Sequence, residues 1–99
     1  MKVIVTENDT KIVAALDGEL DTASVPKVEK DLQPLFNARN KELLIDCSSL
    51  RYISSSGLRL FLSLLKSAKA NGSTLRLEGL KEEILKVFKM TGFDKLFSL

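Results

Sequence analysis

The chain has 99 residues, of which 44% are hydrophobic and none is histidine, and it carries 15 basic against 13 acidic side chains. This composition predicts a single domain over residues 1–99 with a real core, and a net charge of +2 is too small for a nucleic-acid or membrane-surface binder. Without histidine and with one cysteine, the chain can form no Ser-His-Asp triad, no usual zinc site and no internal disulfide, so we expect no enzyme, no cofactor and no metal.

The first elements along the chain are two predicted strands. In residues 2–7, Val3 and Val5 alternate with Lys2, Ile4 and Thr6, which predicts a short β-branched strand, and residues 11–18 are predicted to form a second strand after the turn-forming residues 8–10. So short a link predicts an antiparallel hairpin. Residues 19–21 are expected to carry the chain out of the sheet.

From Thr22 to about Arg39 the apolar period changes to that of a helix. Pro26 suits the first turn of this helix, where its missing N–H would have no partner. Pro34 removes a backbone hydrogen bond from the interior, so we expect the helix to be distorted near residues 30–34.

The second half of the chain continues the alternation of strands and helices. Residues 41–47 hold three consecutive apolar side chains, which is typical of a parallel strand buried on both faces. The segment 48–53 is expected to link this strand to a helix over about 55–70, which is followed by a strand over 73–79 and a helix over 80–92. The order β-β-α-β-α-β-α predicts an α/β fold with a mixed sheet covered by helices, onto which the apolar tail folds back.

Three serines precede a glycine in "YISSSGLRLFL", residues 52–62. Ser54 is expected to be the N-cap of the second predicted helix, leaving the hydroxyls of Ser55 and Ser56 free to point outward. Gly57 is useful where another group must approach the backbone closely. A phosphate on Ser55 would be tolerated at the positive end of the helix dipole and would disturb a partner docked there. The alternative is that the serines only begin a helix.

Leu60 falls at the border between the apolar face and the solvent-facing side of this helix, which we call the shoulder of the helix. At 100° per residue it lies between Ser63 and Ser67, and Arg59 faces solvent. Leu60 is therefore either an ordinary exposed leucine or a contact for a partner helix.

Three motifs carry a resemblance to a known family: "GELD" (18–21), "LLIDCSSLRYISSSGLR" (43–59) and "VFKMTGFDKLF" (87–97). With them the chain resembles the STAS domain, and within it the bacterial anti-sigma factor antagonists. The resemblance implies a mixed sheet of four to five strands. It also implies a protein that binds a serine-kinase anti-sigma factor of the GHKL type and is released when that kinase phosphorylates it. A PP2C-type phosphatase would restore the binding form.

The family pattern, matched onto this chain, makes Ser55 the phosphoacceptor. Ser54 stands where the family has an aspartate, so Ser54 and Ser56 are alternative sites. The resemblance further implies that Asp46 and Ser48 support the site. Asp21 and Asp46 each also have a purely local role open to them, as caps of the turns after their strands.

The expected partner-binding surface comprises eight residues: Asp21, Ser54, Ser55, Ser56, Gly57, Arg59, Leu60 and Ser63. The alternative function is a STAS scaffold, or a module that senses a small ligand, in a signalling complex. The chain shows no signal-peptide pattern and no apolar stretch of about 20 residues, so we expect a cytoplasmic protein, and a monomer is plausible for a domain this small.

Overall fold

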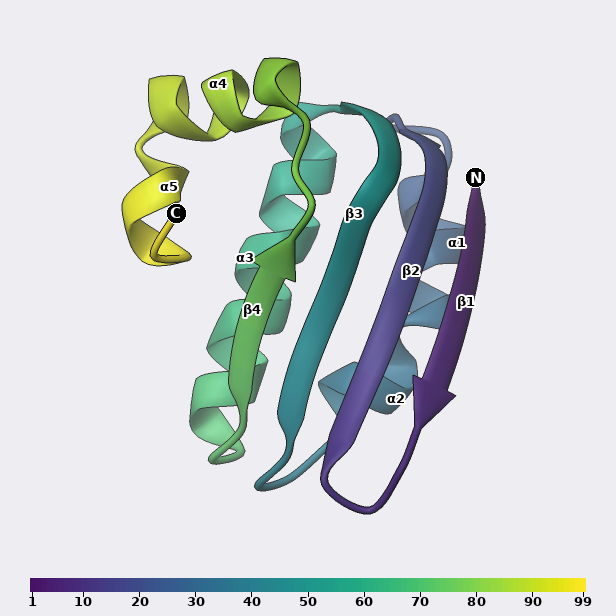
Figure 1. Cartoon of the computed structure of the whole chain (residues 1–99). Helices are drawn as coiled ribbons and strands as arrows, with labels where there is room; N and C mark the ends of the chain where they lie inside the picture. The colour runs from purple at the N-terminus through teal and green to yellow at the C-terminus, as the bar shows by residue number, and fades with distance from the viewer.

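A computed structural model describes residues 1–99 and shows one four-stranded sheet in the order β1-β2-β3-β4. β1 pairs antiparallel with β2, whereas β2 with β3 and β3 with β4 are parallel. The predicted α/β class, mixed sheet and element order are confirmed (Figure 1). The strands are β1 (Lys2–Glu7), β2 (Lys11–Leu20), β3 (Glu42–Ile53) and β4 (Thr74–Glu78).

The helices leave one face of the sheet uncovered (Figure 1). Three of them lie behind the other face: α1 (Val25–Asp31), α2 (Gln33–Phe36) and α3 (Ser55–Ala70). α4 (Glu82–Thr91) lies across the end of the sheet where α3 begins, and α5 (Phe93–Leu96) lies beside β4. No helix is both long and apolar enough to cross a membrane.

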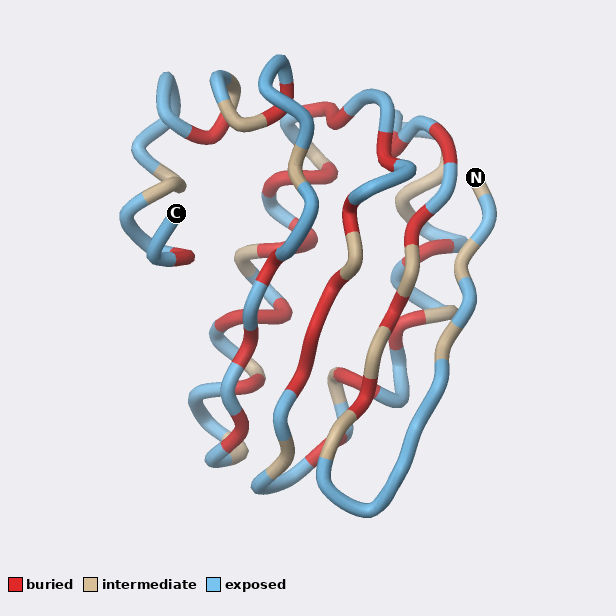
Figure 2. The backbone as a smooth tube through the Cα atoms, in the orientation of Figure 1, coloured by how far each residue is buried: buried red, intermediate tan, exposed pale blue.

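The core lies between the sheet and the helices behind it (Figure 2). Alternate residues of β2 and β3, such as Leu16 and Ile45, are fully buried there. The ring of Phe88 in α4 lies with its centroid 6.3 Å from that of Phe61 in α3 and 5.9 Å from that of Phe97. Phe97 is only 6% exposed, so the tail folds back onto the body as predicted.

β3 is longer than predicted. The segment 48–53, expected to be a link, belongs to the strand, and β2 also continues to Leu20 instead of leaving the sheet at residue 19. Register shifts between Ala15 and Asp17 and between Gly18 and Glu19 allow the two strands to keep pairing. These irregularities break the alternation of apolar and polar side chains, which is why the pattern concealed the strand.

The helix predicted from residue 22 begins at Val25 and is divided into α1 and α2 at Leu32. Pro26 lies in the first turn of α1 and Pro34 in the first turn of α2, positions where a missing N–H costs little. The expected distortion near residues 30–34 is therefore confirmed as a break between two short helices.

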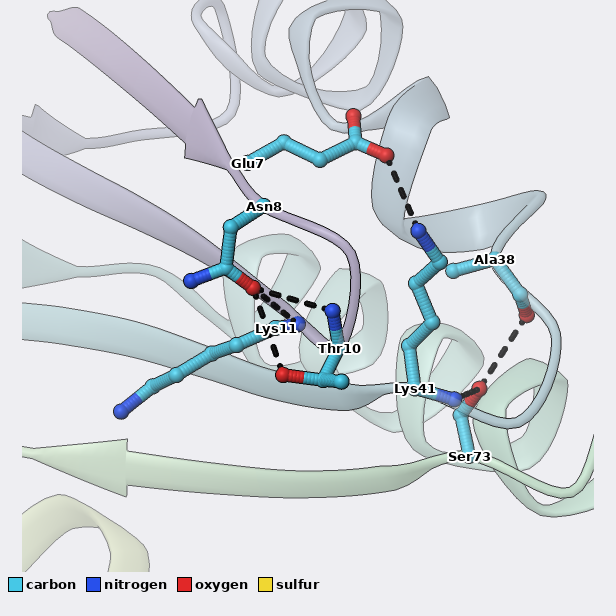
Figure 3. Close-up of polar contacts among 7 residues, drawn as sticks. All are labelled: Glu7, Asn8, Thr10, Lys11, Ala38, Lys41 and Ser73. Carbon is cyan, nitrogen blue, oxygen red and sulfur yellow. Dashed lines mark hydrogen bonds and ion pairs between the residues drawn. The ribbon is translucent and has the colours of Figure 1, made fainter.

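Polar contacts close the end of the sheet that lies away from the first turn of α3 (Figure 3). The Oδ1 of Asn8 accepts hydrogen bonds from the backbone N–H groups of Thr10 and Lys11, at 3.0 and 2.9 Å, and so shapes the β1–β2 turn. The hydroxyl of Ser73 accepts from the N–H of Lys41 at 3.1 Å, which ties the loop before β4 to the loop before β3.

Candidate functional site

The three serines lie where α3 begins, next to the carboxyl ends of β2 and β3. Ser54 follows directly on β3, and its N–H donates to the carbonyl oxygen of Leu20, the last residue of β2, at 2.9 Å. The start of α3 is therefore fixed to both central strands of the sheet.

Ser54 is the N-cap of α3, as predicted. Its Oγ accepts from the N–H of Gly57 at 3.1 Å and donates to the carbonyl oxygen of Leu20 at 3.0 Å. Only 9% of Ser54 is exposed. The prediction that Ser54 forms part of a binding surface is therefore wrong, because its hydroxyl faces the interior and is already hydrogen-bonded.

Ser56 is held in the same network and is half-buried. Its Oγ lies 3.1 Å from the Oγ of Ser54 and donates to the Oγ1 of Thr22 at 3.0 Å. Thr22 belongs to the loop between β2 and α1, so Ser56 fastens this loop to the first turn of α3.

Ser55 differs from both neighbours. Its side chain is exposed, and its hydroxyl makes no hydrogen bond within the protein. Of the three hydroxyls, it alone is free to react or to meet another molecule without breaking an existing contact.

Gly57 is buried, so its predicted place on the binding surface is also wrong. A Cβ at this position would lie 2.9 Å from Cγ1 of Ile53 and 2.9 Å from Cγ of Leu20. The group that approaches this backbone closely is thus the protein's own core, and glycine allows α3 to pack tightly on the ends of β2 and β3.

Leu60 is 4% exposed and belongs to the core, which contradicts both its predicted exposure and its role as a partner contact. It lies on the same side of α3 as Ser67, two turns on. The hydroxyl of Ser67 donates to the carbonyl oxygen of Phe36 in α2 at 2.9 Å. The shoulder of α3 is therefore covered by the α1–α2 segment, which the helical pattern of α3 alone could not reveal.

The remaining predicted surface residues are exposed. Arg59 and Ser63 lie one and two turns after Ser55 on α3, and Arg59 takes part in no ion pair. Asp21 precedes Thr22, and its Oδ1 accepts from the N–H of Ser24 at 2.9 Å, so its local capping role is confirmed. We call Ser55, Arg59, Ser63, Asp21 and Thr22 the Ser55 surface.

Asp46 and Ser48 form hydrogen bonds with each other and none with the three serines at the start of α3. The Oδ1 of Asp46 accepts from the hydroxyl of Ser48 at 2.7 Å and from its N–H at 3.0 Å. These two hydrogen bonds, the side-chain one first, hold the pKa of Asp46 below its usual range. The pair shapes the irregular part of β3, and no hydrogen bond links it to the Ser55 surface. The expectation that Asp46 and Ser48 support the Ser55 surface therefore has no direct hydrogen bond behind it.

Cys47 is fully buried, as the sequence indicated. Burial, aided by the negative charge of Asp46, raises the pKa of the Cys47 thiol to about 12. The thiol is therefore protonated at neutral pH, and it cannot act as a nucleophile.

The sequence interpretation missed two residues near the site. Thr22 holds Ser56, and Tyr52 is 48% exposed only two positions before Ser54. The available signal for Thr22 was a hydroxyl directly after the "GELD" motif. For Tyr52 it was an aromatic side chain just before the three serines. Tyr52 was overlooked because residues 48–53 were not expected to form a strand with two faces.

Comparisons with known proteins point to one family. The profile of the STAS domain matches residues 2–99. The anti-sigma-B factor antagonist of Bacillus subtilis is 30% identical over 99 residues, which cover all of this chain and 90% of that protein. An anti-sigma factor antagonist from Mycobacterium paratuberculosis has a similar structure, with a TM-score of 0.78 and 24% identity over 97% of this chain and 81% of that one. The Bacillus cell fate determinant SpoIIAA, solved in its phosphorylated form, gives a TM-score of 0.72 with 22% identity over 92% of this chain and 84% of that one.

Proposed function

Since this chain belongs to the STAS domain family, we propose that it is an anti-sigma factor antagonist whose partner binding is controlled by phosphorylation of Ser55. Its partner is a serine-kinase anti-sigma factor of the GHKL type, and a PP2C-type phosphatase reverses the modification. The protein acts in the cytoplasm as a single-domain monomer. It is a substrate and catalyses nothing itself, because nucleotide and Mg²⁺ belong to the kinase.

The observation that carries this proposal is that the three serines differ in their hydrogen bonds and in their exposure. Ser54 caps α3 from the interior, and Ser56 joins Ser54 to Thr22. Ser55 is exposed and makes no hydrogen bond, so a kinase can reach it without opening the first turn. This arrangement favours Ser55 over the two alternative phosphorylation sites.

A phosphate on Ser55 would change the surface and leave the fold intact. It would bring a charge of about −1.5 to −2 to the first residue of a 16-residue helix, where the dipole favours an anion. The cap made by Ser54 would stay in place because its partners lie on the inner side. A partner that presents acidic or apolar groups to the Ser55 surface would be repelled.

Arg59 is well placed to give the unmodified surface its specificity. It lies one turn after Ser55, is exposed and pairs with no acidic side chain of its own chain. An acidic group of the kinase can therefore pair with it, and a phosphate on Ser55 would compete for the same guanidinium.

The test combines phosphorylation with binding. The protein is incubated with ATP and the candidate anti-sigma kinase of its host, and intact mass and fragmentation locate the phosphate. We expect one phosphate, on Ser55. Ser55→Ala should bind the kinase like the parent and accept no phosphate, whereas Ser55→Asp should bind at least about tenfold more weakly, a loss of about 1.4 kcal/mol. Ser49→Asp is the matched control, because it adds the same charge at an exposed serine of β3 outside the Ser55 surface.

Each other outcome has a defined meaning. A phosphate on Ser54 or Ser56 would keep the switch but contradict the assignment to Ser55. If no phosphate is transferred and Ser55→Asp binds as tightly as the parent, the switch is refuted and the STAS scaffold becomes the better hypothesis.

A further inference from the structure

Backbone groups at the free edge of β4 are available for pairing, well away from the Ser55 surface in the fold. β4 ends the sheet, because β3 is its only neighbour (Figure 1). The N–H of Thr74 donates to the carbonyl oxygen of Lys41 at 3.0 Å, and Thr74 lies opposite Glu42 in the parallel register. Alternate residues of a parallel strand bond the same neighbour, so the N–H and C=O groups of Leu75 and Leu77 point outward.

A groove of about 490 Å³ runs along this edge. One wall is formed by the consecutive residues 73–77, and the opposite wall by residues 96–99, which comprise the last residue of α5 and the three that follow it. Successive side chains of a strand point to opposite faces of a sheet. A groove lined by consecutive strand residues therefore lies at the edge itself, where an occupant meets the outward groups of Leu75 and Leu77.

The side chains of this β4 groove give it a defined chemistry. Leu65 of α3 and Leu96 of α5 supply apolar surface, and Leu96 is 47% exposed. The charged residues that line it are Lys69 and Arg76, both basic. Arg76 forms an ion pair with Glu78 at 3.3 Å, but both side chains are more than half exposed, so an acidic ligand can replace Glu78 at little cost.

We propose that the β4 groove binds an extended, acidic segment of a partner protein, which adds as a fifth strand beside β4. Its backbone would pair with Leu75 and Leu77, as in other cases of strand addition to a sheet edge. Alternate apolar side chains would face Leu65 and Leu96, and acidic side chains between them would face Arg76. Residues 96–99 close the far side of the groove, opposite β4.

The probe is a fluorescein-labelled heptapeptide of alternating valine and glutamate, blocked at both ends. Fluorescence anisotropy measures its affinity for the full chain, and NMR hydrogen exchange follows individual amides. We expect saturable binding, with new protection of the Leu75 and Leu77 amides. The Thr74 and Arg76 amides face β3 and should be protected already. A peptide with lysine in place of glutamate, and one with N-methylated valines, should each bind at least tenfold more weakly.

Two charge-reversal variants complete the test. Arg76→Glu should weaken binding of the valine–glutamate peptide at least tenfold. Lys66→Glu makes the same charge change at an exposed position of α3 outside the groove and should leave the affinity unchanged. Circular dichroism confirms that both variants remain folded.

Four results would overturn the proposal. They are no binding up to about 1 mM peptide, equal binding of the N-methylated peptide, and equal effects of the two variants. The fourth is protection of Leu75 and Leu77 that rises with protein concentration alone, which would make a second copy the occupant.

Discussion

At the scale of single residues, three adjacent hydroxyls have three different roles because their surroundings differ. Ser54 points inward to Leu20, Ser56 points across to Thr22, and Ser55 points to solvent. Contacts with the end of β2 and the loop before α1 thus give Ser54 and Ser56 a structural role and leave Ser55 available to react.

Removing the Ser54 hydroxyl should therefore cost stability, and removing the Ser55 hydroxyl should not. Ser54→Ala loses the cap of α3 and should lower the free energy of unfolding by about 1–2 kcal/mol. Ser55→Ala should stay within about 0.5 kcal/mol of the parent. Urea denaturation measures both, and equal losses for the two variants would contradict the roles assigned here.

Gly57 should not tolerate a methyl group. Alanine would gain up to about 1 kcal/mol of helix propensity, but its Cβ would press on Ile53 and Leu20 at 2.9 Å. Overpacking of this kind costs about 1–3 kcal/mol, so we expect Gly57→Ala to be net destabilising by about 1 kcal/mol. Thermal unfolding checks this, with Ser63→Ala as the exposed control on the same helix. A higher melting temperature for Gly57→Ala would show that α3 can shift away from the strands.

At the scale of elements, α3 is the helix on which the other layers meet. One side packs on the sheet, the shoulder that carries Leu60 is covered by the α1–α2 segment, and Phe61 contacts Phe88 of α4. The strip that remains exposed runs from Ser55 through Arg59 and Ser63 to Lys66, followed by the last two residues of the helix. The partner-binding surface proposed above is consequently narrower than the sequence suggested.

Truncating Leu60 distinguishes a core residue from a docking residue. Leu60→Ala should lower the free energy of unfolding by about 2–5 kcal/mol, the usual cost of emptying a buried leucine site. Arg59→Ala should change stability by less than about 0.5 kcal/mol and should weaken kinase binding instead. Guanidinium denaturation and a binding titration on the same samples separate the two effects. If the Leu60→Ala protein keeps its stability but binds the kinase more weakly, Leu60 is a partner contact and not a core residue.

At the scale of the whole molecule, the two proposed binding regions belong to different parts of the sheet. The Ser55 surface lies where β2 and β3 end, and the β4 groove lies along the free edge on the far side of β3. They have no residue in common, so one protein could hold its kinase and an extended partner segment at once.

This separation predicts that the two binding activities are independent. Ser55→Asp should weaken kinase binding and leave the valine–glutamate peptide affinity unchanged, and Arg76→Glu should do the reverse. In the double variant the free-energy losses should add to within about 0.5 kcal/mol, as for distant sites without shared partners. Titrations of all four proteins test this, and a clear departure from additivity would reveal coupling through α3 or β3.

Much of the fold could be predicted from the sequence, because it depends on local patterns. The alternation in residues 2–7, the helical period after Ser54 and the turn at Gly92 each act within a few residues of the chain. The cap at Ser54 and the break near Pro34 are equally local. The succession of elements and the position of the serines followed from such signals.

Only the tertiary structure decided which of those serines is free and which apolar residues are covered. The partner of the Ser54 hydroxyl, the carbonyl oxygen of Leu20, lies 34 positions away in the sequence, and so does the partner of Ser56. The cover over Leu60, the full length of β3 and the free edge of β4 likewise depend on segments distant in the chain. A pattern read along one helix or strand records how that element is built, whereas exposure is set by what packs against it.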